Sequence, residues 1–314
     1  MANFTTIVTE FLLLGFSDNQ ELQILYSLLF FLLYSSGLMG NLLIVIITTF
    51  DRRLHSPMYF FLRNLSIVDA CYISVTVPLA SINSLVNNRV ISVSGCAAQI
   101  FLLVFLAYFE LTLLTIMARD HYVAICHPLH YTVIMRPSVC MRMTFTCFVT
   151  GMFFSGFHTG YTFRLSFCKS NVIPQFFCDI PSLLKLSCSE TFSNMLSVIV
   201  SVLVVGLGCF AFIIASYSRI FSTVLRFPVK EDQRKAFSTC LPHIIVISLF
   251  LFSTAVVYLQ PASESDSIKD IILSIFYSII PPLLNPIIYS LRNKQIKEAI
   301  RLVMSRKLLL SNIV

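Results

Sequence analysis

The chain has 314 residues, of which 57% are hydrophobic and only 12% are charged. Its mean hydropathy is +0.84 and its formal net charge is +7. An ordinary soluble domain has about 25% charged residues, so this composition excludes a soluble enzyme or binding domain and predicts a chain solvated by lipid.

Seven long apolar segments follow one another, each long enough for the roughly 20 residues that a membrane-spanning helix needs. They cover residues 24–50, 57–82, 97–117, 141–162, 196–225, 236–260 and 271–291. We therefore expect an all-α integral membrane protein, a single seven-transmembrane helix bundle. Its parts are an extracellular N-terminus at 1–23, the bundle at 24–291 and a cytosolic tail at 292–314.

Lysine and arginine set the expected orientation. Residues 1–51 contain neither, and most of the 22 basic residues lie in alternate loops and helix ends. The positive-inside rule then places the N-terminus outside and the C-terminus in the cytosol. The exceptions, on the predicted outer side, are Arg89, Arg164, Lys169, Lys185 and Lys269. Because the positive charge follows membrane edges, we expect membrane lipid and no nucleic acid as a partner.

The N-terminal segment shows no cleavable signal peptide, since it lacks a basic stretch and carries only a short apolar piece. The first span is expected to act as its own insertion signal. Asn3 begins an Asn-Phe-Thr triplet on the predicted outer side, which makes it a candidate N-glycosylation site.

Four of the ten cysteines lie on the predicted outer side: Cys96, Cys168, Cys178 and Cys188. Four cysteines allow three pairings. The equal spacing of the last three favours a Cys96–Cys178 tether with a Cys168–Cys188 ring, although the sequence leaves the other pairings open. The remaining six cysteines are expected to be reduced.

Two carboxylic acids lie inside predicted spans, Asp69 in the second and Glu110 in the third. Ionisable groups are costly in lipid, so both are candidate functional residues. They could hold a proton or a Na⁺ ion, with neutral oxygens from Asn41, Asn285 and Ser278. The alternative is a protonated, hydrogen-bonded pair that only joins helices. No lysine lies inside a span, which excludes a Schiff base, and no catalytic arrangement is apparent.

A candidate ligand cavity is expected on the outer side of Glu110. Helical geometry puts Leu103 and Ala107 on the Glu110 face of the third span. The expected cavity is apolar with a few hydroxyls and no charge at its centre, which suits a small hydrophobic ligand. Its predicted lining is Leu103, Val104, Ala107, Tyr108, Ser201, Val205, Thr254, Ala255, Tyr258 and Ser278.

The third span ends in "MARDHYVAICHPLHY", residues 117–131. His121 lies about three helical turns beyond Glu110 on the same, inward face. Arg119 points to the opposite face, where we expect it to reach lipid phosphates.

A short amphipathic helix on the inner leaflet is expected after the seventh span. Its apolar and basic positions are Ile296, Ile300 and Val303, and Lys294, Lys297 and Arg301, respectively.

Taken in order, these segments resemble the rhodopsin-like (class A) G protein-coupled receptors, and specifically the vertebrate olfactory receptors. The resemblance rests on "FLLLGF" near the N-terminus, "GN" at 40–41, "LHSPMYFFLRNLSIVD" at 54–69, the 117–131 stretch, "FFCDIPSLLKLSC" at 176–188, "SYSRI" at 216–220, "KAFSTCLPH" at 235–243 and "NPIIY" at 285–289.

The resemblance implies a receptor without a cofactor that binds odorants between spans three, five, six and seven. It also implies a heterotrimeric G protein partner of the stimulatory olfactory type, which raises cyclic AMP, and a place in the plasma membrane of olfactory sensory cilia. Cys96 and Cys178 match the family's loop-to-helix disulfide. The residues that it implicates in coupling and activation are Asp120, His121, Tyr122, Tyr217, His243 and Tyr289.

Two positions depart from the family pattern. His121 stands where the family usually has arginine, and Leu251 where it usually has an aromatic residue. Histidine is shorter than arginine and can be neutral at pH 7. We therefore expect that His121 neither forms an ionic lock with Asp120 nor reaches as far as arginine toward Tyr217, so that coupling is weak or pH-dependent.

Two alternatives to a working receptor are a transporter and a receptor-like protein that binds ligand but couples poorly. A transporter predicts related halves with broken helices, a pattern that the seven spans do not show. The second alternative follows from His121 itself.

Overall fold

The computed structural model describes residues 8–14, 19–86, 89–167, 170–173, 175–188, 191–258, 278–293 and 295–302. Side chains are not described at 253–258 and 291–292.

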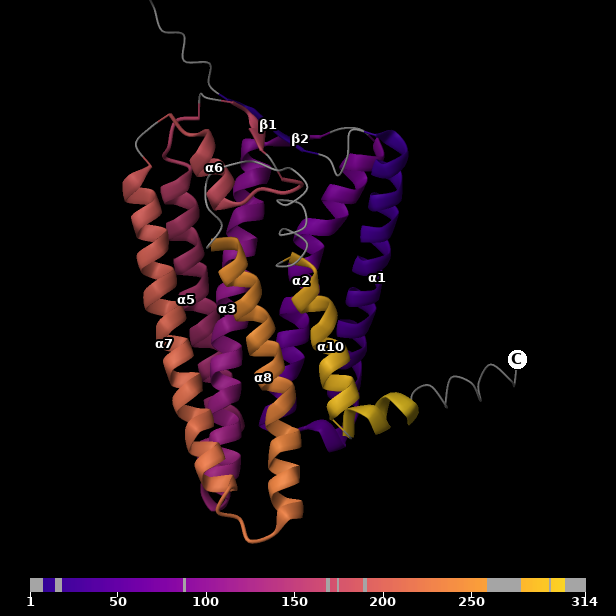
Figure 1. The fold of residues 1–314 in the computed structure, drawn as a ribbon, viewed down its shortest axis with the longest axis vertical. Coiled ribbons are helices and arrows are strands. Elements are labelled where there is room, and N and C mark those ends of the chain that lie inside the picture. The colour runs from indigo at the N-terminus through magenta and orange to yellow at the C-terminus, as the bar shows by residue number, and fades with distance from the viewer. Residues whose placement is uncertain are drawn as a thin grey trace, which may run out of the picture.

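The described residues form a bundle of long helices, with a short cap of strands at one end (Figure 1). Six helices are long and apolar enough to cross a membrane within the described part of the chain. They are α1 (Gln20–Phe50), α2 (Pro57–Val86), α3 (Val93–Cys126), α5 (Pro137–Thr162), α7 (Phe192–Val224) and α8 (Lys230–Tyr258). Helix α10 (Ile280–Arg292) is the described end of the seventh predicted span. The predicted all-α membrane bundle is confirmed.

Several helices extend beyond the predicted apolar runs, and at α1 a polar residue caps the extension. Asn19 accepts hydrogen bonds from the backbone N–H groups of Glu21 (2.9 Å) and Leu22 (3.4 Å), so α1 starts before residue 24. The third run was expected at 97–117, yet α3 continues to Cys126. Hydropathy ends at the first charged residue, whereas helical hydrogen bonding continues past the apolar layer.

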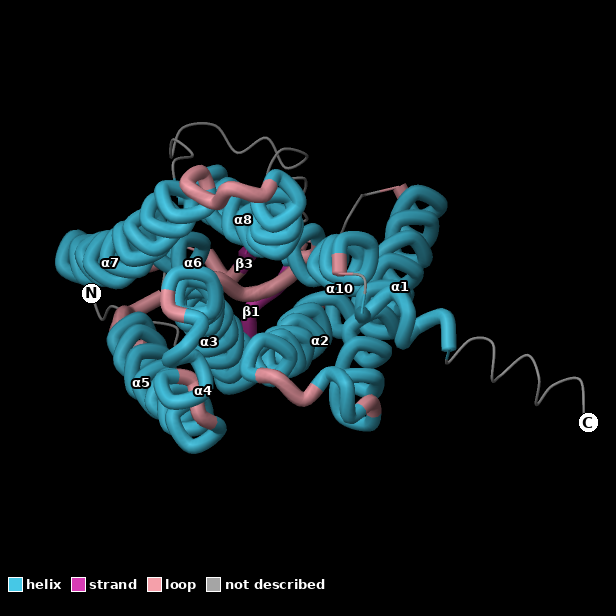
Figure 2. Tube along the Cα trace, turned by 90° about the horizontal axis from the view of Figure 1, so that it is seen from below, coloured by secondary structure: helices cyan, strands magenta, loops and turns pink. Residues whose placement is uncertain are grey.

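Helix α3 lies at the centre of the bundle and packs against α2, α5, α7 and α8 (Figure 2). Glycine permits close approach at two of the packed surfaces. A Cβ atom at Gly151 of α5 would lie 3.0 Å from Tyr108 and 3.2 Å from Phe105 of α3. A Cβ at Gly40 of α1 would lie 3.1 Å from Pro286 of α10. Small residues at helix contacts are the usual means of close packing in lipid.

The outer end is closed by a small three-stranded sheet in the order β2-β1-β3. Strand β1 (Glu10–Leu13) pairs antiparallel with β2 (Val90–Ser92) and parallel with β3 (Val172–Ile173). Phe11, fully buried, anchors β1 in a second apolar core that also contains the short helix α6 (Ile180–Leu186). The N-terminal segment and the long outer loop thereby form one lid.

The Cys96–Cys178 disulfide fixes this lid to the outer end of α3, with the two Cα atoms 5.5 Å apart. The backbone N–H of Cys178 also donates to Oε1 of Gln99 at 2.8 Å. Cys188 is disulfide-bonded as well. Its favoured partner, Cys168, lies outside the described residues, as does the glycosylation candidate Asn3, so both of those expectations stay predictions.

The chain turns after α10 into a second short helix at residues 295–302. Ile296 is fully buried and Ile300 partly buried, whereas Lys297 and Arg301 are exposed. The hydroxyl of Tyr59 on α2 donates to Oε1 of Gln295 at 2.6 Å. This is the predicted amphipathic helix; Lys294 and Val303 lie outside the described residues.

The disulfide gives the first prediction. Replacing Cys178 by serine should lower the free energy of unfolding by about 2–5 kcal/mol, because the bond closes a long loop. The measurement is the melting temperature of the purified receptor, together with its surface expression. Cys209, a free cysteine on α7, provides the control substitution Cys209→Ser. Equal melting temperatures for the two variants would contradict the proposed role of the tether.

Candidate functional site

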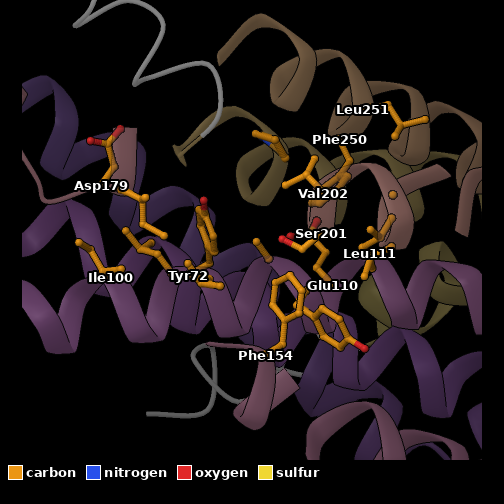
Figure 3. A pocket seen from close by; sticks show the side chains of 18 of the residues that line it. Tyr72, Ile100, Glu110, Leu111, Phe154, Asp179, Ser201, Val202, Phe250 and Leu251 are labelled. Carbon is orange, nitrogen blue, oxygen red and sulfur yellow. The ribbon is translucent and has the colours of Figure 1, made fainter. Parts of the chain in front are cut away.

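A cavity of about 690 Å³ lies beneath the lid, among α3, α7, α8 and α10 (Figure 3). Small-molecule sites have volumes of roughly 300–1,000 Å³, so the size fits such a ligand. Six predicted residues line it: Leu103, Val104, Ala107, Tyr108, Ser201 and Val205. Ser278 is buried and is not among the lining residues. The side chains of Thr254, Ala255 and Tyr258 lie outside the described part of the chain.

Most of the remaining wall is aromatic or aliphatic, and sequence reasoning missed it. Its aromatic members are Tyr72, Phe154, Phe177, Phe210 and Phe250. Phe154 comes from α5, which was not expected to reach the ligand. Leu251, the position where an aromatic residue was expected, does line the cavity, and the neighbouring Phe250 supplies a ring there. Which side chains face the cavity depends on how each helix is rotated about its own axis, and the hydropathy of the sequence does not reveal that rotation.

Ser201 gives the cavity a polar point on its α7 wall. Its hydroxyl donates to the carbonyl oxygen of Ser197 at 2.6 Å and lies 2.9 Å from Nε2 of His158 on α5. His158 is only 4% exposed and its ring packs on Phe154, with the ring centres 4.5 Å apart. His158 thereby holds the Ser201 hydroxyl in place at the cavity wall. The sequence did not indicate this role, because a single histidine in an apolar span has no distinctive pattern.

Two carboxyl side chains also line the cavity, Glu110 and Asp179. In Figure 3 Glu110 and Asp179 lie well apart along the cavity. Asp179 accepts from the backbone N–H of Ser182 at 3.0 Å and so caps α6. Burial raises the pKa of the Asp179 carboxyl above its usual value. The sequence placed Glu110 below the cavity and did not indicate that the loop would bring Asp179 into the wall.

Below the cavity, the predicted polar core comes together between α1, α2, α3 and α10. Asn285 donates to Oδ2 of Asp69 at 3.0 Å, and Asn41 donates to the carbonyl oxygens of Gly37 (3.0 Å) and Pro282 (2.9 Å). Glu110 lies close enough to Asp69 for their charges to interact. Among the described residues, one side-chain oxygen of each of these four polar residues is buried without a hydrogen-bond partner.

These features set a ligand-sized cavity over a buried acid pair in a seven-span bundle, and the family model for the olfactory receptors matches residues 30–307. The chain belongs to the olfactory receptor family. It is 62% identical to olfactory receptor 14C36 of Homo sapiens over 306 residues, 98% of either chain. It is 52% identical to olfactory receptor 14A16 of Homo sapiens over 308 residues, 98% of this chain and 99% of the relative. The fold is that of squid rhodopsin, with a TM-score of 0.74 at 17% identity, over 92% of this chain and 87% of the rhodopsin.

At the cytosolic end of this olfactory receptor, three side chains from three helices form a hydrogen-bonded chain. The Tyr217 hydroxyl of α7 lies 3.2 Å from Nδ1 of His121 on α3 and 2.5 Å from Nδ1 of His243 on α8. All three residues are at most 6% exposed. His121 thus contacts Tyr217 directly, and the expectation that it reaches less far than arginine stays a prediction. The tyrosine ring spans the gap, because α7 approaches α3 closely here.

Asp120 has a different partner from the one considered in the sequence. It accepts a hydrogen bond from the hydroxyl of Tyr131 at 2.8 Å, which ties α3 to the short helix α4 (Tyr131–Ile134). Burial and the nearby Asp120 carboxylate raise the pKa of Tyr131, so this hydroxyl stays protonated and can donate. Asp120 and His121 thus act on different neighbours, and no ionic lock between them is needed to satisfy either.

Arg119 and the remaining coupling residues, Tyr122 and Tyr289, lie outside this hydrogen-bonded chain. Arg119 lies on the side of α3 away from Glu110 and contacts Sδ of Met143 at 3.9 Å, in agreement with the predicted outward face. Tyr122 bonds to Nε2 of His127 at 3.1 Å. The Tyr289 hydroxyl of α10 is buried with no hydrogen-bond partner among the described residues.

The cavity gives the second prediction. A Cβ at Gly206 meets no atom within 4 Å, and Gly206 lines the cavity, so Gly206→Leu should fill part of the ligand space. The steric cost to a ligand of about 1–3 kcal/mol corresponds to a loss of affinity of roughly 5- to 150-fold. The measurement is the receptor's response to a panel of volatile apolar compounds.

Gly208 provides the matched control, because it also has open space at its Cβ and does not line the cavity. Gly208→Leu should respond as the unsubstituted receptor does. The same response from both variants would show that ligands bind elsewhere.

Proposed function

We propose that this olfactory receptor binds a small, mostly apolar odorant in the 690 Å³ cavity and activates a stimulatory olfactory-type G protein, which raises cyclic AMP. The chain is a multi-pass plasma membrane protein of a receptor family rather than an enzyme. The observation that carries the proposal is the largely apolar cavity beneath the disulfide-held lid. Among its described lining residues, the polar side-chain groups are those of Ser201, Glu110, Asp179, Tyr72 and Tyr108. Olfactory sensory cilia are the expected site of action.

The ligand would act on the cytosolic end through α8. Phe250 and Leu251 of α8 line the cavity, and His243 lies about two helical turns further toward the cytosol on the same helix. A ligand that packs better when α8 has shifted favours the shifted state by that difference in affinity alone. The shift would break the contact between Tyr217 and His243 and open the cytosolic end to the G protein.

The polar core supports a second element of the proposal, a Na⁺ ion or a proton held by Asp69 and Glu110. Buried oxygens without donors on Asn41, Asp69, Glu110 and Asn285 fit a bound cation, since each would otherwise be left unsatisfied. The described residues contain no group of three or more His, Cys, Asp or Glu placed for a transition metal, and a hard ion with oxygen ligands suits this donor set better.

The core gives the third prediction. Replacing Na⁺ by a large organic cation should change basal cyclic AMP in the unsubstituted receptor, and Asp69→Asn should abolish that change by removing a ligand charge. Asp179→Asn, which removes an acid outside the core, should keep it. If basal signalling is insensitive to both Na⁺ and pH, the acid pair only joins helices.

The fourth prediction concerns His121. Arginine at this position is always charged and offers five donors, so His121→Arg should raise the ligand-stimulated cyclic AMP response and make it less dependent on pH. The response is measured at matched surface expression. His130→Arg, which adds the same charge at an exposed nearby position, should have no effect.

An unchanged response in His121→Arg would mean that histidine couples as well as arginine here. No response to any compound in either form, with normal surface expression, would favour a receptor that binds but does not couple. Accumulation of a labelled ligand in vesicles without G protein would instead favour transport.

A further inference from the structure

The His121–Tyr217–His243 chain has a geometry that hydrogen bonding alone does not require. Nδ1 atoms of two histidines, from α3 and α8, approach one oxygen of α7 from two sides, at 3.2 Å and 2.5 Å. The tyrosine hydroxyl has one hydrogen, so it donates to only one of the two nitrogens. The other nitrogen must then carry a hydrogen itself. One potential metal ligand from each of three helices thus lies in the same place: Nδ1 of His121, the hydroxyl oxygen of Tyr217 and Nδ1 of His243.

The spacing of the two imidazoles fits a shared metal ion. The His121 and His243 ring centres are 5.2 Å apart, with planes inclined by 62°. Two imidazoles that bind one tetrahedral ion through nitrogens about 2.1 Å away have their ring centres roughly 5 Å apart. Nδ1 of His243 and the Tyr217 oxygen are 2.5 Å apart, whereas two ligand atoms of a tetrahedral ion are about 3.4 Å apart, so the tyrosine side chain would have to move back by about 1 Å.

We propose that His121, His243 and the hydroxyl oxygen of Tyr217 form a binding site for a divalent transition metal ion, Zn²⁺ or Cu²⁺. Two imidazoles with one phenol oxygen form a donor set that binds Zn²⁺ or Cu²⁺ in preference to Ca²⁺ or Mg²⁺, which favour ligands made of oxygen alone. In the bound state both Nδ1 lone pairs point at the ion and the tautomers carry their hydrogens on Nε2.

The site depends on a residue in which this chain departs from its family. Arginine at position 121 has no lone pair to give to a metal, whereas a neutral histidine does. With His121 in place, an ion would join α3, α7 and α8 at their cytosolic ends. This consequence rests on the proposed function: if activation separates α8 from α3, an ion bound only to the closed arrangement stabilises the inactive receptor.

The direct test measures metal binding by the purified full chain in lipid nanodiscs, using equilibrium dialysis with radioactive Zn²⁺. The expected result is one ion per chain that is lost in His121→Phe and in His243→Phe. Loss of an outer-shell partner weakens metal sites roughly 10–100-fold, so loss of a direct ligand should weaken this one by about 100-fold or more. Tyr217→Phe, which keeps both imidazoles, should lose less.

His130→Phe is the matched control, since His130 is exposed at the end of a short 3-10 helix (Pro128–His130) and is not part of the proposed site. It should bind Zn²⁺ as the unsubstituted chain does. Unchanged binding in both His121→Phe and His243→Phe, or no bound ion in the unsubstituted chain, would overturn the site. Loss of binding in His130→Phe would assign the ion to surface histidines and overturn it too.

A second measurement keeps the test decisive if a variant fails to fold. Cu²⁺ bound to the unsubstituted chain should give an electron paramagnetic resonance spectrum with coupling to two imidazole nitrogens, and a spectrum with one or none would contradict the site.

In membranes open on both faces, Zn²⁺ should lower G protein nucleotide exchange by the unsubstituted receptor and leave His121→Arg unaffected. Binding without this effect would refute the inhibitory consequence and leave the metal site standing. Failure of every compound to stimulate exchange would instead count against the proposed function.

Discussion

The burial of polar side chains between apolar helices is the constraint on which the rest of the structure depends. In lipid, a buried donor or acceptor without a partner is costly, so such groups decide which helices must meet and at what height. Helix α3 carries three of them on one side: Gln99 bonds to the lid, Glu110 faces the Asp69 core, and His121 meets Tyr217. Because one continuous helix holds all three, the lid, the cavity floor and the cytosolic contact are in fixed register.

Because the heights of these contacts are fixed, ligand binding in the apolar cavity can affect the cytosolic end through a single helix, without a separate chain of coupled residues. The cavity touches α8 at Phe250 and Leu251, and α8 meets the histidine chain at His243. Among the described side chains of α8, few apolar ones are buried, Cys240, Val246 and Ile247 among them, and its cytosolic half is largely exposed. An element with little buried surface moves at lower cost than one with much. Helices α2 and α3, which bury a larger share of their membrane spans than α8 does, remain as the frame.

The sequence was informative about composition, periodicity and placement of polar groups, and less so about geometry. The seven apolar runs, the inward face of α3 through Leu103, Ala107, Glu110 and His121, and the tether at Cys96 followed from rules about lipid, helical pitch and redox environment. The contact between His121 and Tyr217 did not follow from these rules, because it depends on the size and position of the tyrosine as well as on the length of the histidine. Asp179 and Phe154 were missed for a related reason: the folding of a loop and the rotation of α5 leave no trace in hydropathy.

We propose that a ligand in the cavity separates the cytosolic end of α8 from the rest of the helix bundle. Spin labels at exposed positions test this directly, one at Phe50 on α1 and one at Ser238 on α8, in the purified receptor with a stimulating odorant and its G protein. Ligand is expected to lengthen the distance between these two labels, while the distance in a pair at Phe50 and Ala124 of α3 stays unchanged. A Phe50–Ser238 distance that is the same with and without bound ligand would contradict it.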